Sequence, residues 1–325
     1  MGIKNPLKEL NMKKFAMLGK WHVHAPEYAN LINELPDCKV VKVWDEDEQT
    51  AKEWAAFLEC EAASVEDILA DPEIWGVVIC TATRDHGPLM VKVCESGKAL
   101  FTEKVLTLKT EDALKVKAAV EKNDTLFAIS YPHLSEPHVQ FALETAKSGK
   151  LGTVNYARLR NVHNGSIANW LPPHFYDGSA CGGGAMIDLG AHPMYLLTDL
   201  MGLPHKVHSV FTFVTGRGVE DNAVSVLEYE NGAIGVSETG FVSVDYPYFF
   251  EIGGDKGTVV VQGTDVKWCA ECTDHQWLTP AVMPERKPLP IQMWAKADTI
   301  DDVPENIRID AAVRLTRVME MAYEK

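Results

Sequence analysis

The sequence has no long apolar run and no segment that would direct the chain into a membrane. No stretch reaches the roughly 18 consecutive apolar residues that a membrane-spanning helix needs. Residues 1–11 are polar, carry both signs of charge and lack the apolar core of a signal peptide. We therefore expect them to form a short leader before the first strand.

Positive charge is also scarce. The chain has 31 Lys and Arg against 46 Asp and Glu, a formal net charge of −15 at pH 7. Such a surface repels the phosphates of nucleic acids and of anionic lipids. We therefore expect no nucleic acid and no membrane surface among its partners.

The sequence lacks the regular set of closely spaced cysteines that a disulfide-rich protein has. Seven cysteines, an odd number scattered through a chain of 325 residues, fit reduced thiols in the cytoplasm better than a disulfide framework. Cys269 and Cys272 have Cys-x-x-Cys spacing, with His275 three residues further on, which is compatible with a zinc site or with a loop carrying two free thiols. Because no second pair is nearby, we expect no metal.

The sequence does contain a change of pattern near residue 131, and 325 residues suit two domains. Up to that point, short apolar runs alternate with helical stretches of about 10–15 residues, which predicts βαβ units. We expect residues 1–131 to form an α/β domain with a doubly wound parallel sheet. Ligands of such sheets bind at the carboxyl ends of the strands, which we place at Gly19, Asp45, Thr81 and Glu103.

Residues 132–325 have a different pattern. Strand-like runs joined by short turns predict an α+β domain with a large, mostly antiparallel sheet. The expected strands cover residues 153–162, 207–214, 223–229, 233–244, 248–253 and 257–261. We expect residues 264–304 to be irregular, because they are rich in proline, and residues 306–325 to form an amphipathic helix that can pack back on the first domain.

Three glycines at 182–184 lead into an apolar run that predicts one helix continuing to Met201. On that helix Asp188 and His192 are four residues apart and share a face. An aspartate beside a histidine on a rigid element can act as an oriented base. The alternative is an amphipathic core helix in which both residues are incidental.

The segment after the first strand, Gly19–His24, is only a partial match to a dinucleotide-binding loop. The Gly-x-Gly-x-x-Gly pattern lets the backbone approach a pyrophosphate, but here Trp21 and His24 replace the second and third glycines. Asp45, at the end of the second strand, can bind the adenosine ribose hydroxyls and would repel a 2′-phosphate, which favours NAD over NADP. Alternatively, Asp45 belongs to a solvated acidic turn.

Two further strand ends carry side chains suited to chemistry. The small residues from Thr81 to Thr83 allow a cofactor to approach the backbone closely. Lys104, after Glu103, can bind a substrate hydroxyl and stabilise charge on its oxygen. The alternative for Glu103 and Lys104 is a surface ion pair of little energetic value.

Taken in order, these segments resemble the Gfo/Idh/MocA family of sugar and polyol oxidoreductases over nearly the whole chain. The run from Gly183 to His192 matches the family pattern Gly-Gly-x-x-x-Asp-x-Gly-x-His. The other matching segments are Gly19…His24-Ala25…Tyr28, Asp45, Thr81…His86, Gly97-Lys98…Glu103-Lys104 and Gly149-Lys150-Leu151-Gly152.

The resemblance implies an NAD(P)-linked enzyme that oxidises a carbinol of a sugar or cyclitol, with Lys104, Asp188 and His192 as catalytic residues. Imidazole titrates near neutral pH, so His192 suits the role of proton acceptor. The expected cofactor is NAD, with NADP less favoured. We expect it to contact Gly19, Trp21, His22, Val23, Asp45, Thr81, Thr83, His86, Glu103 and Lys104.

Substrate contacts are expected from aromatic, amide and imidazole side chains before the glycine run. Aromatic faces suit the C–H side of a sugar ring, and amide and imidazole groups suit its hydroxyls. The candidates are Asn161, His163, Trp170, His174 and Tyr176, and the alternative for each is an ordinary loop residue.

The sequence departs from the family pattern at three places. Val105 follows Lys104 where the family usually has proline, and because a non-proline cis bond costs about 3 kcal/mol we expect a trans bond here. The segment from His133 to Pro137 stands where an arginine is common. Trp21 occupies the second glycine position.

Two other functions remain open at this point. One is a redox-assisted lyase or glycosidase that retains its NAD, and the other is a non-catalytic sugar-sensing relative. The resemblance, with apolar strand faces at residues 224–227 and 234–236, also predicts a homo-oligomer, either a dimer or a tetramer.

Overall fold

The computed structural model describes residues 12–324 and divides into two compact units. Unit 1 contains the chain up to Thr107 together with Glu111–Ser130 and Leu289–Ala312. Unit 2 contains Leu108–Thr110, Tyr131–Pro288 and the chain from Val313 onward. The leader expected at residues 1–11 lies outside the described residues. That the two parts of the chain act as separate domains stays a prediction.

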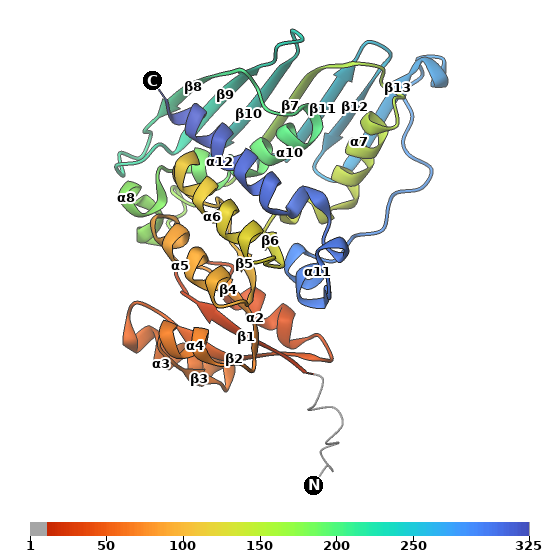
Figure 1. Cartoon of the computed structure of the whole chain (residues 1–325). Helices are drawn as coiled ribbons and strands as arrows, with labels where there is room; N and C mark the ends of the chain where they lie inside the picture. The colour runs from red at the N-terminus through yellow and green to blue at the C-terminus, as the bar shows by residue number, and fades with distance from the viewer. Residues whose placement is uncertain (1–11, 325) are drawn as a thin grey trace. The chain divides into compact units, whose positions relative to one another are not determined.

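Unit 1 is built on a six-stranded parallel sheet with the strand order β3-β2-β1-β4-β5-β6 (Figure 1). The order reverses between β1 and β4, and a crevice for a ligand forms at such a switch point. The doubly wound α/β fold predicted for this part is confirmed. The strands are β1 (Lys13–Leu18), β2 (Cys38–Trp44), β3 (Glu61–Ala62), β4 (Ile74–Ile79), β5 (Ala99–Thr102) and β6 (Phe127–Ile129).

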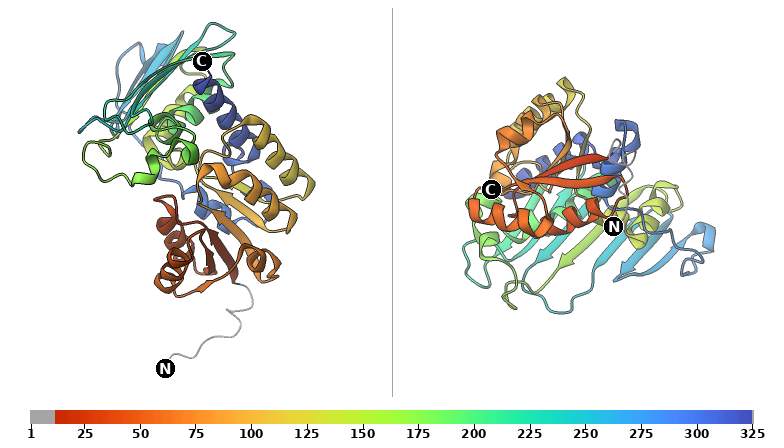
Figure 2. Two further views of the ribbon diagram at one scale, coloured as in Figure 1. Left: turned by 90° about the vertical axis from the view of Figure 1, so that its left-hand side faces the viewer. Right: turned by 90° about the horizontal axis from the view of Figure 1, so that it is seen from below.

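Helices flank this sheet (Figure 2), and two of them begin at side-chain caps. Asp47 accepts the N–H of Thr50 at 3.0 Å, and Ser64 accepts the N–H of Asp67 at 3.0 Å, so both side chains satisfy a free N–H group in the first turn of a helix. The helices are α2 (Ala25–Asn33), α3 (Glu48–Leu58), α4 (Val65–Ala70), α5 (Thr83–Glu95), α6 (Thr110–Lys122) and α11 (Pro290–Lys296).

Helix α11 corrects the expectation that residues 264–304 are irregular. It begins at Pro290, a residue suited to the first helical position, and buries Trp294 in the core of unit 1. The indole ring lies 5.4 Å from the ring of Phe15 and 5.6 Å from that of Phe101, and its N–H donates to the Leu126 carbonyl at 3.1 Å. The prolines therefore flank a helix that tertiary packing stabilises.

Unit 2 is built on a seven-stranded sheet with the order β13-β12-β11-β7-β10-β9-β8. All neighbours are antiparallel except β7 and β10, so the predicted mostly antiparallel sheet is confirmed. The strands are β7 (Val154–Val162), β8 (Lys206–Thr212), β9 (Asn222–Glu228), β10 (Ile234–Gly240), β11 (Phe249–Gly254), β12 (Gly257–Gln262) and β13 (Asp265–Ala270).

Strand β13 is a second correction to the irregular region. It pairs with β12 from Gly257↔Ala270 to Gln262↔Asp265, through a turn that includes Gly263. Cys269 belongs to this strand and Cys272 to the 3-10 helix that follows, and both are free cysteines.

Helices cover one face of the unit 2 sheet: α7 packs on β11–β13, α9 on β9 and β10, and α10 on β7 and β10. The helices are α7 (Pro137–Lys147), α8 (Gly178–Cys181), α9 (Ala185–Asp188), α10 (Ala191–Met201) and α12 (Ile309–Tyr323). Short 3-10 helices cover Pro132–Ser135 (η1), Pro173–Tyr176 (η2), Glu271–Thr273 (η3), Ile300–Asp302 (η4) and Glu305–Ile307 (η5).

The single helix expected from the glycine run to Met201 is wrong, because the structure divides it into α9 and α10. The N–H of Gly190 donates to the Ala185 carbonyl at 2.9 Å, five residues back, and that of His192 to Leu189 at 3.1 Å, three residues back. A Cβ on Gly190 would lie 2.4 Å from the Met186 carbonyl oxygen, so the close approach needs glycine here. Asp188 and His192 therefore do not lie on one face of a single regular helix, as their spacing of four residues had predicted.

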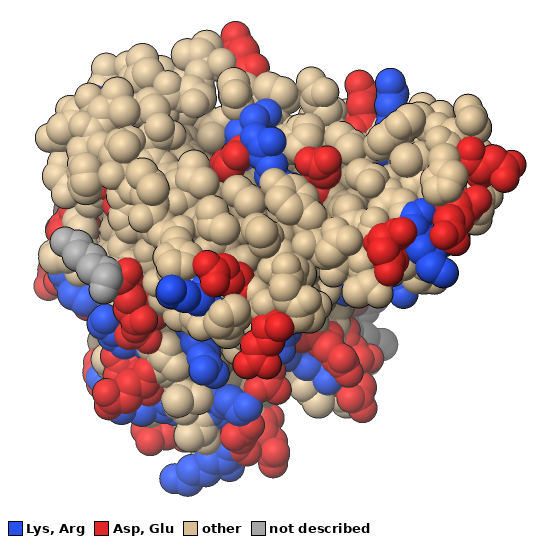
Figure 3. Space-filling model, turned by 90° about the horizontal axis from the view of Figure 1, so that it is seen from above, with Lys and Arg blue, Asp and Glu red and all other residues tan. Residues whose placement is uncertain are grey.

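The other face of the unit 2 sheet carries apolar side chains around an ion pair. Val224 and Ile234 are exposed on it, and Arg158 contacts Glu238 through two bonds of 2.9 and 3.1 Å. Figure 3 shows the side of the molecule on which this face lies, and uncharged residues predominate there.

In the described part of the chain, no helix is both long enough and apolar enough to cross a bilayer.

Candidate active site

The loop from Gly19 to His24 joins β1 to α2 at the carboxyl edge of the unit 1 sheet. Gly19 has φ +87°, and a Cβ there would lie 2.6 Å from Cγ2 of Thr81. Its N–H donates to the Trp44 carbonyl at 2.8 Å, and that of His22 to the Cys80 carbonyl at 3.1 Å. The structure thus brings predicted cofactor residues from two strand ends together.

Asp45 braces this loop. Its Oδ2 accepts the N–H of Lys20 at 2.7 Å, and its Oδ1 accepts the N–H of Asp47 at 3.0 Å. It therefore does more than belong to a solvated acidic turn, because its carboxylate is oriented by the segment that follows β1.

Asp45 also lines a groove of about 770 Å³ along β2, β3, α3 and α4 of unit 1. The two lysines in its wall have acidic partners: Lys42 lies 2.9 Å from Asp71, and Lys52 lies 3.3 Å from Glu48. The carboxylates in the wall are those of Asp45, Glu48, Glu61, Asp67 and Asp71, so acidic groups outnumber basic ones.

His86 is buried in α5 and links two strand ends. Its Nδ1 lies 3.1 Å from the Val105 carbonyl oxygen and its Nε2 3.2 Å from that of Thr81. Burial lowers the pKa of His86, although both carbonyls favour its protonated form. Thr83, also buried, is the first residue of the same helix.

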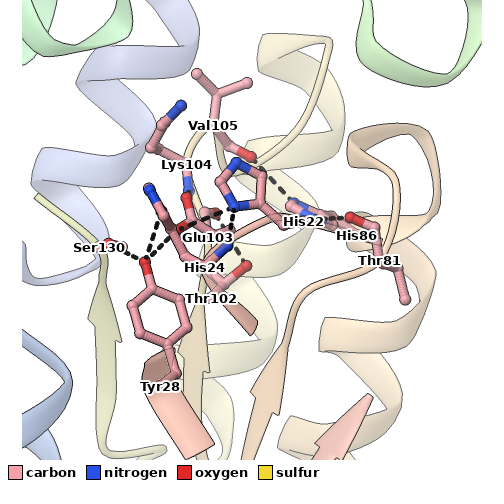
Figure 4. A network of polar contacts seen from close by, with 10 residues as sticks. All are labelled: His22, His24, Tyr28, Thr81, His86, Thr102, Glu103, Lys104, Val105 and Ser130. Atoms are coloured by element: carbon pink, nitrogen blue, oxygen red, sulfur yellow. Dashed lines mark hydrogen bonds and ion pairs between the residues drawn. The ribbon is translucent and has the colours of Figure 1, made fainter. Parts of the chain in front are cut away.

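A polar network converges on Glu103, which is 1% exposed at the end of β5 (Figure 4). Its carboxylate accepts the hydroxyl of Tyr28, and its Oε1 lies 2.9 Å from Nδ1 of His24. The Tyr28 oxygen lies 2.6 Å from Oγ of Ser130, and Nδ1 of His22 lies 3.7 Å from the Glu103 carboxylate. An ionised carboxylate only accepts hydrogen bonds, so His24 carries its proton on Nδ1.

The charges in this network are set by the neighbours of Glu103. Burial opposes ionisation, but His22, His24 and Lys104 outweigh it, so the pKa of the Glu103 carboxyl lies well below its usual range. Burial and the Glu103 charge together raise the pKa of Tyr28 well above its ordinary value. The site therefore holds a buried carboxylate and a protonated phenol.

Lys104 follows this carboxylate. Its backbone N–H donates to Oε2 of Glu103 at 2.9 Å, so the reading of Glu103 and Lys104 as an exposed ion pair is wrong. The trans bond expected between Lys104 and Val105 is also wrong, since that peptide bond is cis. Both residues are buried, and the Val105 carbonyl is the one that contacts His86.

His22, His24 and Glu103 have ligand-type atoms within 4.8 Å of one another. Their contacts are those of hydrogen bonding: the N–H of His24 lies on Nδ1 of His22 at 3.3 Å, and Nδ1 of His24 lies on the carboxylate. We therefore assign them to the Glu103 network. Of the other predicted cofactor residues in this loop, Val23 is exposed and Trp21 is half-buried.

In unit 2, a buried carboxylate holds the glycine run that precedes α9. Oε1 of Glu220 accepts the N–H groups of Gly184 and Met186 at 2.9 and 3.0 Å, and the Tyr323 hydroxyl at 2.5 Å. A Cβ on Gly183 would lie 2.1 Å from that hydroxyl. The glycines therefore let the backbone pack directly against the last turn of α12.

This support places Asp188 at the end of α9 and His192 in the first turn of α10. Asp188 is half-buried and His192 is 5% exposed. Nδ1 of His192 lies 3.2 Å from the Tyr195 hydroxyl, which orients the ring. A histidine held in this way can exchange a proton through its other nitrogen.

The predicted substrate residues of unit 2 fall into two groups. His163 stacks on Phe241 at 4.9 Å and tilts against Trp170 at 4.6 Å, and Trp170 remains 53% exposed. Tyr176 bonds to Ser166 at 2.9 Å instead of contacting that stack. Asn161 lies near the end of β7 and His174 lies in η2, and both are half-buried.

Several residues of these networks were not predicted from the sequence to belong to the site. Glu220 and Tyr323 carried no local signal, because their partners are far away in the sequence. Tyr28 and His24 had a signal as matched positions of the family pattern. The remaining residues that were not predicted as members of the site are Ser130, Tyr195 and His133. His133 was noted only within the segment that differs from the family pattern.

Comparison with known proteins agrees with this architecture. Residues 13–131 match the family described as "Oxidoreductase family, NAD-binding Rossmann fold", and residues 139–260 match the "GFO/IDH/MocA C-terminal domain". The fold and the matches define an NAD-binding oxidoreductase. The chain belongs to the Gfo/Idh/MocA family, as its sequence motifs indicated.

Two curated relatives act on inositols by their names. The scyllo-inositol 2-dehydrogenase (NAD(+)) of Bacillus subtilis (strain 168) is 27% identical over 260 residues, which cover 76% of this chain and 72% of the relative. The myo-inositol 2-dehydrogenase of Thermotoga maritima is 23% identical over 243 residues, covering 71% and 70%.

Solved structures share the fold. GenD2 from gentamicin A biosynthesis in complex with NAD has a TM-score of 0.80 at 24% identity, covering 97% of this chain and 94% of that one. Levoglucosan dehydrogenase in complex with NADH and L-sorbose has a TM-score of 0.79 at 18% identity, covering 96% of each chain.

Proposed function

We propose that this protein is an NAD-dependent dehydrogenase that transfers a hydride between a carbinol carbon of a sugar, sugar derivative or cyclitol and the nicotinamide. The observation that carries the proposal is His192, a buried imidazole oriented by Tyr195 directly after the braced glycine run. It lies in a chain that also holds Lys104 next to a buried carboxylate at the end of a Rossmann strand.

The residues at the carboxyl edge of the unit 1 sheet fit a dinucleotide. Gly19 lets the loop after β1 pack directly against Thr81 just beyond the end of β4, and the carboxylate of Asp45 is oriented beside this loop. When bound, the nicotinamide supplies the hydride-accepting carbon. Gly19, Trp21, His22, Val23, Asp45, Thr81, Thr83, His86, Glu103 and Lys104 are the residues we propose to hold it.

The proposed mechanism assigns one role each to His192 and Lys104 and two alternative roles to Asp188. His192 accepts the proton of the carbinol hydroxyl on Nε2, because its Nδ1 contacts Tyr195. Lys104 donates to the same oxygen and stabilises the negative charge that develops on it. Asp188 binds a neighbouring hydroxyl or orients the imidazole. The carbon then loses its hydride as the carbonyl forms.

The preference for NAD over NADP rests on the groove beside Asp45. A 2′-phosphate there would meet a carboxylate already fixed by the Lys20 N–H, in a wall where acidic groups outnumber basic ones. The two lysines of the wall have acidic partners, which reduces their attraction for a further anion.

Substrate binding is proposed for Asn161, His163, Trp170, His174 and Tyr176. The exposed face of Trp170, supported by His163, suits the C–H side of a sugar ring. The protein is further proposed to be a homo-oligomer that buries the open face of the unit 2 sheet, and to work in the cytoplasm.

The test is a thermal-shift screen of NAD⁺ and NADP⁺, each combined with a panel of sugars and cyclitols, followed by NADH formation with the best pair. Ligand binding raises the melting temperature by mass action. We expect NAD⁺ to shift it more than NADP⁺, and one polyol class to shift it further. Lys104→Met and His192→Ala should each lower kcat by about 10²–10⁴-fold.

A control variant and three other results distinguish this function from its alternatives. His275→Ala, on an exposed turn, should leave kcat unchanged. Nicotinamide that copurifies, with no turnover of free NAD⁺, would favour a redox-assisted lyase or glycosidase. Polyol binding without any chemistry would favour a sensor. Full activity in His192→Ala would refute the mechanism.

A further inference from the structure

Two histidines are stacked face to face in unit 2. His133 lies in η1, which begins just after β6, and His192 lies in α10. Their ring centroids are 4.3 Å apart and their planes differ by 14°. The stack joins the proposed proton acceptor to a second imidazole with a similar ordinary pKa.

Tyr195 holds both partners of the stack. Its hydroxyl oxygen accepts the backbone N–H of His133 at 3.0 Å and lies 3.2 Å from Nδ1 of His192. The phenol ring is stacked on that of Tyr131 at 4.1 Å, with planes 13° apart. The arrangement of the two imidazoles is therefore fixed by a third side chain that is itself packed.

A stack of this kind cannot readily take up two protons. Two imidazolium ions face to face at 4.3 Å repel each other, and His192 is too buried for water to screen the repulsion well. When two sites interact in this way, their protons bind in two steps that belong to the pair.

The titratable rings that pack beside the pair on Tyr248 are uncharged near neutral pH. His138 and His133 pack edge-on against Tyr248, at 5.5 and 5.4 Å. Burial, opposed by Glu136, lowers the pKa of His138, and burial raises that of Tyr248, so both are neutral near pH 7. The titratable groups that contact the pair or its neighbours are Tyr131, His138, Tyr195 and Tyr248. The charged groups next to these are Glu136, which bonds to Arg286, and Arg314, which acts on Tyr131, while Asp188 ends the preceding helix α9.

We propose that His133 is a positioning residue whose protonation is coupled to that of His192 through their stack. At neutral pH the pair holds at most one positive charge, and a second proton binds only in clearly more acidic solution. This rests on the proposed function for its catalytic meaning: because a proton on one ring lowers the proton affinity of the other, the charge state of His133 sets how readily His192 acts as a base. The coupling itself is a property of the chain alone.

The experiment follows imidazole NMR signals of histidine-labelled full-length protein from about pH 5 to pH 9. Variants of single histidines assign the signals among the 11 histidines. We expect the His192 signal to shift in two steps separated by at least about one pH unit, equivalent to a tenfold difference in proton affinity, with His133 showing the same two midpoints.

His133→Phe keeps an aromatic ring for stacking and removes the titrating group. In that variant the His192 signal should follow a single step. His138→Phe is the matched control: it removes a histidine that also packs on Tyr248, and it should leave both steps of His192 unchanged. The wild-type curve tests the proposal even if His133→Phe does not fold.

One-step titration of His192 in the wild-type protein, with the same midpoint within about 0.2 unit in His133→Phe, would overturn the proposal. Under the proposal, the acid side of the kcat profile moves in His133→Phe while KM for the polyol is retained. Loss of activity in His192→Ala alongside uncoupled titration refutes this inference only. Coupled titration without any dehydrogenase activity refutes the proposed function only.

Discussion

Glu103 is the residue on which the polar contacts at the strand edge of unit 1 converge. A carboxylate with 1% exposure is costly unless donors surround it, and here Tyr28, His24 and the Lys104 N–H supply them. This network determines where the peptide that carries Lys104 lies.

Glu103→Gln should lower the free energy of unfolding at pH 7 by on the order of 3 kcal/mol, because it removes one partner of a buried charged network. The folded-state pKa of Glu103 is depressed. Its contribution is therefore complete above the unfolded-state pKa of about 4.3 and is lost as the pH falls towards the lower folded value. The difference between wild type and variant should shrink by about 1 kcal/mol between pH 6 and pH 3.5.

Urea unfolding at several pH values measures this difference. Glu48→Gln is the matched control, because Glu48 makes only an exposed i,i+4 ion pair with Lys52. This substitution should leave the free energy of unfolding unchanged at every pH. An equal stability of Glu103→Gln and wild type at pH 7 would show that the network does not stabilise the fold.

At the residue scale, the sequence could place the candidates but not their partners. Gly19, Asp45, Thr81 and Glu103 were predictable because parallel strands end at one edge of a sheet. Tyr28 contacts Glu103 across 75 residues of sequence, and Tyr323 contacts Glu220 across 103. No local pattern carries such pairings, so the supports of both networks could only be found in three dimensions.

At the scale of elements, α11 is the piece of unit 1 that comes from far along the chain. Trp294→Ala should destabilise the protein by about 3–5 kcal/mol, because it empties a fully buried site between Phe15 and Phe101. Chemical unfolding followed by circular dichroism measures the change.

Trp277→Ala provides the comparison. Trp277 is a tryptophan in the same proline-rich region but is exposed, and its removal should change stability by no more than about 0.5 kcal/mol. Equal effects of the two variants would mean that α11 does not complete the core of unit 1.

Long, regular elements were predictable and interrupted ones were not. The period of the apolar residues was enough for both sheets. The prolines near residues 280–290 obscured α11, and β13, which contains no proline, was assigned to the same irregular region. The break between α9 and α10 depends on Gly190 lying against the Met186 carbonyl, and no periodicity reports such a close approach. The cis bond before Val105 likewise contradicted the usual preference of a non-proline residue.

At the scale of the whole molecule, the open face of the unit 2 sheet is the surface that we propose to meet a second copy. Val224→Lys and Ile234→Lys should abolish assembly and give the mass of one chain, 36.0 kDa, by light scattering after gel filtration. Lysine suits the fold at both positions, because the cross-strand neighbours are Glu238 and Glu228.

Phe57→Lys is the control, since Phe57 is an exposed apolar residue of α3 on unit 1 and should leave the assembly intact. A wild-type protein that already has the mass of one chain at micromolar concentration would refute the oligomer.

The return of residues 289–312 to unit 1 also bears on how the protein is made. A ribosome releases β1–β6 first and α11 only after the whole unit 2 sheet has been translated. At a translation rate of about 5–20 residues per second, Trp294 is synthesised on the order of 10–30 s after the last residue of β6. During that time Phe15, Trp75 and Phe101 lack the indole ring that packs against them in the folded protein. The nascent chain therefore exposes aromatic side chains that chaperones can bind.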